Sequence, residues 1–131
     1  MKDIMVTTID TDADGVSFFG SQEFPTHNRN EMVLTGQIDA VNFRLRQSAP
    51  DYQSDWHVAG DPTLIIILKG TLRISLRNGE YRDFSSGKMF IAKDKLPDGV
   101  AFDQEKHGHR AEVKSETALS AAHVKLEKLQ T

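Results

Sequence analysis

The chain has 131 residues, a length typical of a single domain. Its 38% hydrophobic and 27% charged residues exclude a disordered chain and a coiled coil, and its lack of cysteine excludes disulfides and thiolate ligands. The net charge of −3, with 16 basic and 19 acidic residues well mixed, argues against a nucleic-acid partner, and the longest apolar run, residues 64–68, is too short for a membrane helix. Because no signal peptide is visible, we expect a cytoplasmic protein with no membrane partner.

Residues 1–30 are polar and interrupted, and we expect them to be irregular or to form an edge strand beside a barrel core at about residues 38–127. Residues 39–47 alternate between an apolar set, Val41, Phe43 and Leu45, and a polar set, Asn42, Arg44 and Arg46. This alternation predicts a strand with a buried apolar face and a solvated polar face. If the arginine face pointed into the barrel instead, its guanidinium groups would suit a carboxylate or a phosphate.

A hairpin follows in the middle of the chain. Residues 64–68 are apolar throughout and predict a strand covered on both faces. Residues 71–77 alternate again, and residues 81–84 return as their partner, because the Asn78-Gly79 pair between them favours a tight turn.

The last third of the chain predicts more short strands. In order, we expect a strand at residues 89–92, a long polar loop at 94–108, a strand at 110–113 and a final element within 117–129. The apolar spacing of that final element fits a helix and a strand equally well, and we favour a strand at 118–127. Many short strands separated by turns predict one all-β domain, a sandwich or a barrel, over residues 1–131.

Five positions around the buried strand follow a known spacing. His57 and Gly70 stand at the first histidine and the closing glycine of the first cupin motif, G-x5-H-x-H-x3,4-E-x6-G. Ala59 replaces the second histidine, Thr63 the glutamate and Asp51 the leading glycine. The stretch therefore resembles the cupin family, with a degenerate motif.

The second cupin motif, G-x5-P-x-G-x2-H-x3-N, is matched in part as well. Gly87 is in place, Lys93 stands at the proline, and an insertion at about residues 96–106 separates them from His109, which matches the histidine. Val113 replaces the final asparagine. The resemblance is to a small bacterial cupin and implies an antiparallel jelly-roll β-barrel, commonly a homodimer.

The resemblance also implies where a site would lie. A complete cupin site holds iron, manganese, nickel or zinc on three histidines and a glutamate, and only His57 and His109 remain here. A third metal ligand would have to come from Asp94 or from His107, which forms an H-x-H pair with His109. We expect any metal to be weakly bound.

Two further residues complete the predicted ligand pocket. Trp56 directly precedes His57 and either packs in the core or at the rim, or walls the pocket mouth. Arg44 lines the pocket only if its strand face points inward. His57 and His109 are expected to face one internal cavity.

Three functions remain open on the sequence. The first is a domain that binds a small-molecule ligand without an obligatory metal, favoured by the loss of two ligand positions. The second is a metal-dependent enzyme, an oxygenase or isomerase of a small organic acid or sugar derivative. The third is a structural or dimerisation module. We expect a homodimer, because open sheets leave edges that a second chain protects.

Overall fold

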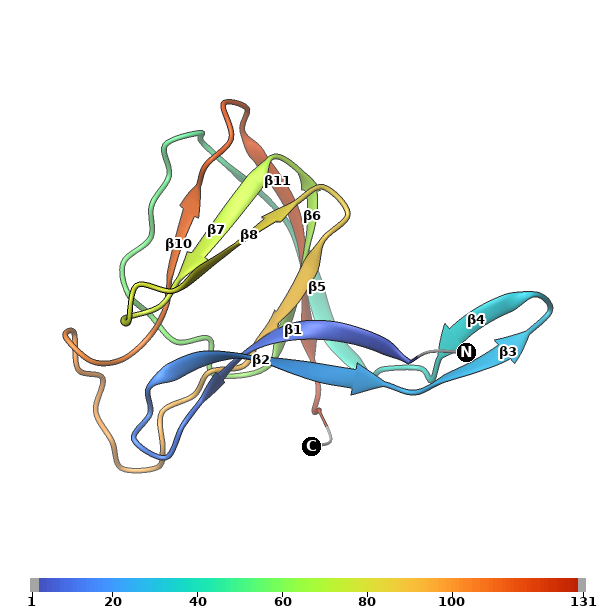
Figure 1. The fold of residues 1–131 in the computed structure, drawn as a ribbon, viewed down its shortest axis with the longest axis horizontal. Coiled ribbons are helices and arrows are strands. Elements are labelled where there is room, and N and C mark those ends of the chain that lie inside the picture. Colours follow the sequence, from blue (N-terminus) through green and yellow to red (C-terminus); the bar gives the residue numbers. More distant parts are fainter. Residues whose placement is uncertain (1–2, 130–131) are drawn as a thin grey trace.

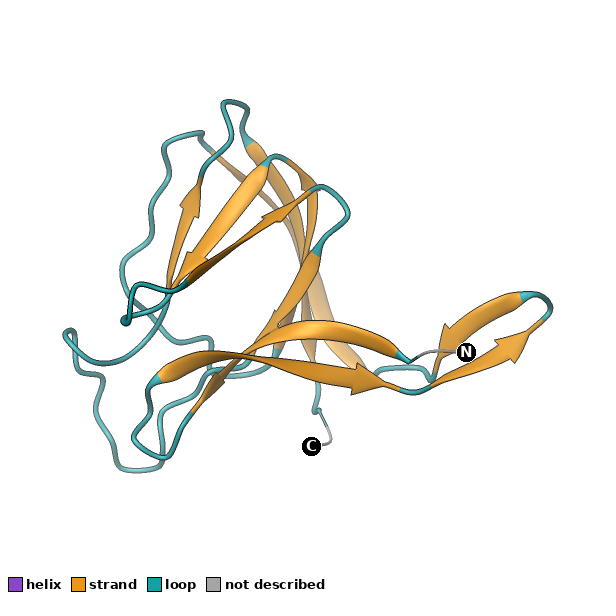
Figure 2. Ribbon diagram, in the orientation of Figure 1, coloured by secondary structure: helices purple, strands orange, loops and turns teal. Residues whose placement is uncertain are grey.

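The computed structural model describes residues 3–129, and none of these residues is helical (Figure 2). In chain order its strands are β1 (Ile4–Thr11), β2 (Ser17–Phe24), β3 (Thr26–Arg29), β4 (Met32–Thr35), β5 (Ala40–Ser48), β6 (Thr63–Lys69), β7 (Thr71–Ser75), β8 (Tyr81–Ser85), β9 (Met89–Ala92), β10 (Arg110–Val113) and β11 (Leu119–Leu126). Across the described residues, no helix is present that would be long and apolar enough to cross a membrane.

Two sheets face each other across one core (Figure 1). The larger sheet has the order β2-β1-β9-β6-β11-β5 and the smaller has the order β10-β7-β8. The pairings in both sheets are antiparallel apart from that of β1 with β9, which is parallel. The core side chains come from both sheets and include Ile9, Ile67, Phe90 and Leu119 from the larger one and Leu72, Ile74 and Phe84 from the smaller one. This arrangement confirms the predicted all-β fold, with two facing sheets of mainly antiparallel strands.

The predicted hairpin and the predicted C-terminal strand are both confirmed. β7 and β8 pair from Thr71 opposite Ser85 to Ser75 opposite Tyr81. Gly79 in the connecting turn has a φ of 91°, which glycine adopts without strain, and the Asn78 side chain accepts a hydrogen bond from the backbone N–H of Glu80. β11 lies between β6 and β5, so this segment is a strand rather than a helix.

The N-terminal residues are more ordered than the sequence predicts. β1 lies inside the larger sheet between β2 and β9, and of these two N-terminal strands only β2 lies at an edge. Residues 6–9 are the reason, because β-branched Val6, Thr8 and Ile9 are buried on both faces of the sheet. The flanking acidic residues obscure this short segment in the sequence.

The prediction for the faces of β5 is wrong. Val41, Phe43 and Leu45 are exposed at 58%, 67% and 71%, whereas Arg46 is half-buried. Arg46 lies opposite Ala121, a core residue, so the polar face of β5 points toward the core side of the sheet. The apolar side chains instead lie on the outer face of the larger sheet, which the second sheet does not cover.

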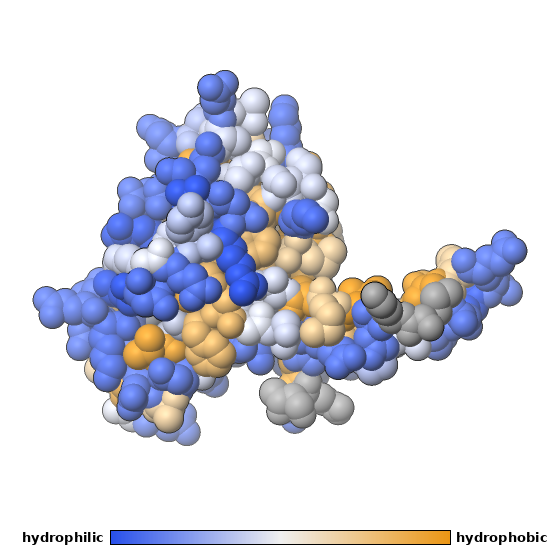
Figure 3. Space-filling view, viewed as in Figure 1, coloured by the Kyte–Doolittle hydropathy of each residue, from blue (hydrophilic) through white to orange (hydrophobic). Residues whose placement is uncertain are grey.

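The outer face of β6 is only partly covered, which also differs from the prediction. Ile65 and Ile67 are buried in the core, but Leu64 and Ile66 on the other face are half-buried and Leu68 is exposed. Strands β3 and β4 form a hairpin that extends away from the two sheets like an arm (Figure 1). Apolar side chains gather where this arm leaves the body (Figure 3).

Candidate functional site

The chain between β5 and β6 runs beside β10 and brings two histidines together. His57 and His109 form a backbone bridge in which each N–H donates to the other's carbonyl, at 3.0 and 2.9 Å. Their ring centroids lie 4.5 Å apart, as the sequence predicts for residues that share a site. His109 is buried whereas His57 is exposed, so the pair reaches the protein surface through His57, which differs from the internal cavity that we expected.

Gly108 permits the close approach of these two segments. Its φ is 91°, and a Cβ at this position would lie 2.8 Å from both the backbone nitrogen and the backbone oxygen of His57. Any other residue would therefore push the two histidine segments apart.

Asp94 orients His109 from behind. The carboxyl is fully buried and accepts three hydrogen bonds, from the backbone N–H of Ala59 at 3.0 Å, from the Ser17 hydroxyl at 2.7 Å and from His109 Nδ1 at 2.7 Å. Because Nδ1 of His109 is occupied in this way, its Nε2 is the nitrogen left for a ligand.

His57 presents the same nitrogen. Its Nδ1 donates to the backbone carbonyl of Asp55 at 2.8 Å, and neither Nε2 atom of the pair hydrogen-bonds to any residue in 3–129. Burial of the ring part that packs on His109 lowers the pKa of His57, and the nearby His109 and Arg46 lower it further, against the opposing effects of the Asp55 carbonyl and the Asp94 carboxyl.

Arg46 is a candidate site residue that the sequence analysis named only on the condition that its strand face points inward. Its Nε donates to the Ser48 hydroxyl at 2.8 Å, and its guanidinium lies 5.2 Å from the centre of the Tyr52 ring. Burial lowers the pKa of this arginine, and within residues 3–129 it pairs with no carboxylate. The signal was available, because Arg46 shares its strand face with Arg44.

Arg44 is on the same face of β5 as Arg46, two residues earlier in the strand, and lies opposite His123 of β11. It lines a groove of about 190 Å³ together with His123, the residue opposite it on β11. Arg44 therefore lies on the same sheet face as Arg46 but remains exposed to solvent, and His123 is its neighbour on β11.

His107 and Trp56 are engaged in structural contacts. His107 Nδ1 accepts from the Asp103 backbone N–H at 2.9 Å and its Nε2 donates to the Asp14 carbonyl at 3.2 Å, so neither nitrogen is left for a metal. The Trp56 ring lies under the guanidinium groups of Arg77 and Arg110, at 4.1 and 4.8 Å. Both contacts hold the 94–108 loop and its neighbours in place.

The residues present do not fit the metal site that the resemblance to cupins implies. Both Asp94 oxygens are occupied by hydrogen bonds, and His107 is committed elsewhere. Within residues 3–129 no group of three or more histidine, aspartate or glutamate side chains is arranged to hold a metal ion. Two imidazoles therefore remain where a divalent metal normally needs three or four protein ligands.

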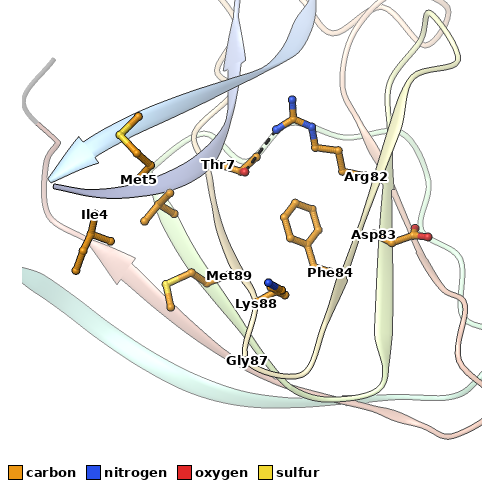
Figure 4. Close-up of a pocket in the computed structure, with 10 residues that line it drawn as sticks. Ile4, Met5, Thr7, Arg82, Asp83, Phe84, Gly87, Lys88 and Met89 are labelled. Carbon is orange, nitrogen blue, oxygen red and sulfur yellow. Dashed lines mark hydrogen bonds between the residues drawn. The ribbon is translucent and has the colours of Figure 1, made fainter. Parts of the chain in front are cut away.

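A second open groove, of about 550 Å³, lies between β1 and the β8–β9 turn (Figure 4). Its one arginine, Arg82, donates to the Thr7 hydroxyl at 3.4 Å and lies 4.6 Å from the centre of the Phe19 ring. Asp83 points away from the groove and pairs with Arg73. This groove contains no convergent set of free polar groups, so it is a weaker candidate than the imidazole pair.

No family model and no curated protein matches the chain. Similar solved structures include a protein from Neisseria meningitidis, 18% identical over 70% of this chain and 84% of that chain, with a TM-score of 0.47. They also include a cupin superfamily protein from Desulfitobacterium hafniense, 17% identical over 78% and 84% of the two chains, and a cupin domain from Bordetella pertussis, 14% identical over 70% and 88%, both with TM-scores of 0.47. At this identity the likeness is one of fold and says nothing of a ligand.

Proposed function

We propose that this protein binds a small organic anion at the surface beside β5, on Arg46, His57 and His109, without a resident metal. The observation that carries the proposal is Arg46, a half-buried guanidinium with no carboxylate partner in residues 3–129. A buried cation is costly unless it is paired, and a carboxylate that enters with the ligand would supply the missing partner.

The imidazole pair supports an acidic ligand in two ways. Each Nε2 accepts a hydrogen bond from a protonated acid, or donates one to a carboxylate after the ring takes up a proton. Asp94 holds His109 Nδ1 at 2.7 Å, so the ring keeps its orientation in either state. Among residues 3–129, the one carboxyl that hydrogen-bonds to the pair is Asp94, and it lies on the buried side, away from the entering anion.

Calorimetric titration of protein made without a chelating tag tests the proposal, with propionate, valerate and benzoate as probes at low salt. Arg46→Gln should weaken binding about tenfold to a hundredfold, because a charge-assisted hydrogen bond is worth about 1.5–3 kcal/mol. Arg29→Gln in the exposed arm is the control and should leave binding unchanged. Stoichiometric metal in the purified protein, or no effect of Arg46→Gln, would overturn the proposal.

A further inference from the structure

A groove lined by basic side chains lies next to Arg46 on the inner face of the larger sheet. Its volume is about 190 Å³, and its lining residues are Asn42, Arg44, Thr63, His123 and Lys125. Arg44 lies opposite His123, just as Arg46 lies opposite Ala121. Since alternate residues of a strand point to one face, the groove and Arg46 belong to the same surface.

None of the five residues that line the groove is acidic. Arg44 forms no ion pair in the described part of the chain, and Lys125 pairs only with the exposed Asp61, at 3.1 Å. His123 Nε2 is buried without a hydrogen-bond partner in residues 3–129. A buried imidazole nitrogen beside an unpaired guanidinium is the environment that an anionic oxygen would satisfy.

The spacing of the two arginines sets the length of a ligand that reaches both. Two residues along a strand advance about 6.6–6.8 Å. An extended chain advances about 1.2 Å per bond, since three backbone bonds span about 3.3–3.6 Å, so the carboxyl carbons of glutarate and adipate lie about 5 and 6 Å apart. The backbone spacing of the two arginines is therefore close to the length of a short dicarboxylate, and adipate comes nearer to it than glutarate.

We propose that the ligand is a dicarboxylate of this length, with one carboxylate at Arg46 and the imidazole pair and the other in the Arg44–His123 groove. This rests on the proposed function, to which it adds the class of ligand. Monocarboxylates fill the first position alone and leave the Arg44–His123 groove empty.

The test is calorimetric titration with valerate, glutarate and adipate, which differ in the second carboxylate and in chain length. Wild-type protein should bind glutarate or adipate at least about tenfold more tightly than valerate, which corresponds to about 1.4 kcal/mol. Arg44→Gln should remove this advantage and leave valerate binding unchanged. His123→Gln should reduce it in part, and Arg29→Gln should have no effect.

The outcomes separate the two proposals. If valerate binds and depends on Arg46, but glutarate and adipate bind no more tightly, the dicarboxylate inference fails and anion binding stands. If Arg44→Gln weakens valerate and glutarate equally, the second position does not exist. If no carboxylate binds to folded wild-type protein, both proposals fail.

Discussion

Asp94 is the residue through which the core holds the imidazole pair. Its carboxyl joins β2, the 57–60 segment and the residue before β10 by hydrogen bonds to Ser17, Ala59 and His109. Sequence reasoning considered it a substitute metal ligand because it is an acidic residue near a motif histidine. Its full burial gives it the different role of orienting His109.

Replacing Asp94 with asparagine tests this role. The new amide keeps the size of the side chain but turns a donor toward at least one of the existing donors, so we expect a loss of about 2–4 kcal/mol from buried groups left unsatisfied. Urea unfolding measures this loss. Asp98→Asn, on the exposed part of the same loop, should change stability by no more than about 0.5 kcal/mol. Equal midpoints for both variants would show that Asp94 does not hold the site together.

His123 makes stability depend on pH. Burial, then Arg46 and Arg44, lower the pKa of this histidine below its ordinary 6.5, and Lys125 lines the same groove. In the unfolded chain this histidine takes up a proton as the pH falls below about 6.5, whereas in the folded chain it does so only at lower pH. The free energy of unfolding is therefore highest above pH 6.5 and decreases as the pH falls toward the lowered pKa of the folded state.

Thermal unfolding between about pH 7.5 and 5.5 measures this effect, since that range spans the ordinary titration of histidine. We expect the midpoint of the wild type to fall toward the acidic end, and the fall to be smaller in His123→Gln. His27→Gln, an exposed histidine in the arm, is the matched control and should follow the wild type. A His123→Gln slope equal to that of the wild type would contradict the assignment.

At the scale of elements, Gly108 joins β10 to the 49–62 segment. Gly99 in the same loop also has a positive φ, 78°, but an added Cβ there meets no atom within 4 Å. Gly99→Ala should therefore cost only the backbone strain, about 1–2 kcal/mol. Gly108→Ala adds a contact with the His57 backbone, so it should cost more and should separate the two rings.

Denaturant unfolding compares the two glycine variants, and the histidine ring signals in an NMR spectrum report the separation. Similar losses of stability, with unchanged ring signals for His57 and His109, would show that the close backbone approach at Gly108 has no consequence. Loss of anion binding in Gly108→Ala alone would connect this junction to the proposed function.

At the scale of the whole molecule, the outer face of the larger sheet is apolar. Val41, Phe43 and Leu45 are exposed on the edge strand β5, and a groove of about 310 Å³ nearby is lined mainly by apolar residues, among them Ile38 and Leu64. Exposed apolar patches and open strand edges favour association. The homodimer expected from the sequence therefore remains a prediction, now with a specified surface.

Phe43→Asp tests this surface. Light scattering at about 100 μM should give a dimer for the wild type and a monomer for the variant, because a charge on the buried face of an interface is costly, and weak dimers still assemble at this concentration. Val100→Asp, at an exposed loop residue, should remain dimeric. A monomeric wild type would contradict the prediction that the outer face binds a second copy of this chain.

Local patterns determined much of the fold. The Asn78-Gly79 turn and the alternation before it predict the β7–β8 hairpin, because turn geometry depends on neighbouring residues. The spacing of motif positions also predicts that His57 and His109 meet. In each case the information lies within a short segment or in a resemblance to a known pattern.

Only the tertiary structure decided which face of β5 is covered and what surrounds the histidine pair. Alternation is the same whether Phe43 or Arg46 points inward, and the answer depends on the register of β5 with β11, a strand far along the chain. In the same way, Asp94 and His107 are both candidate ligands by composition, and they differ only in the donors that the fold brings to each side chain. Burial and hydrogen bonding are collective properties of the packed sheets, so the site became defined only when its separate segments were in place.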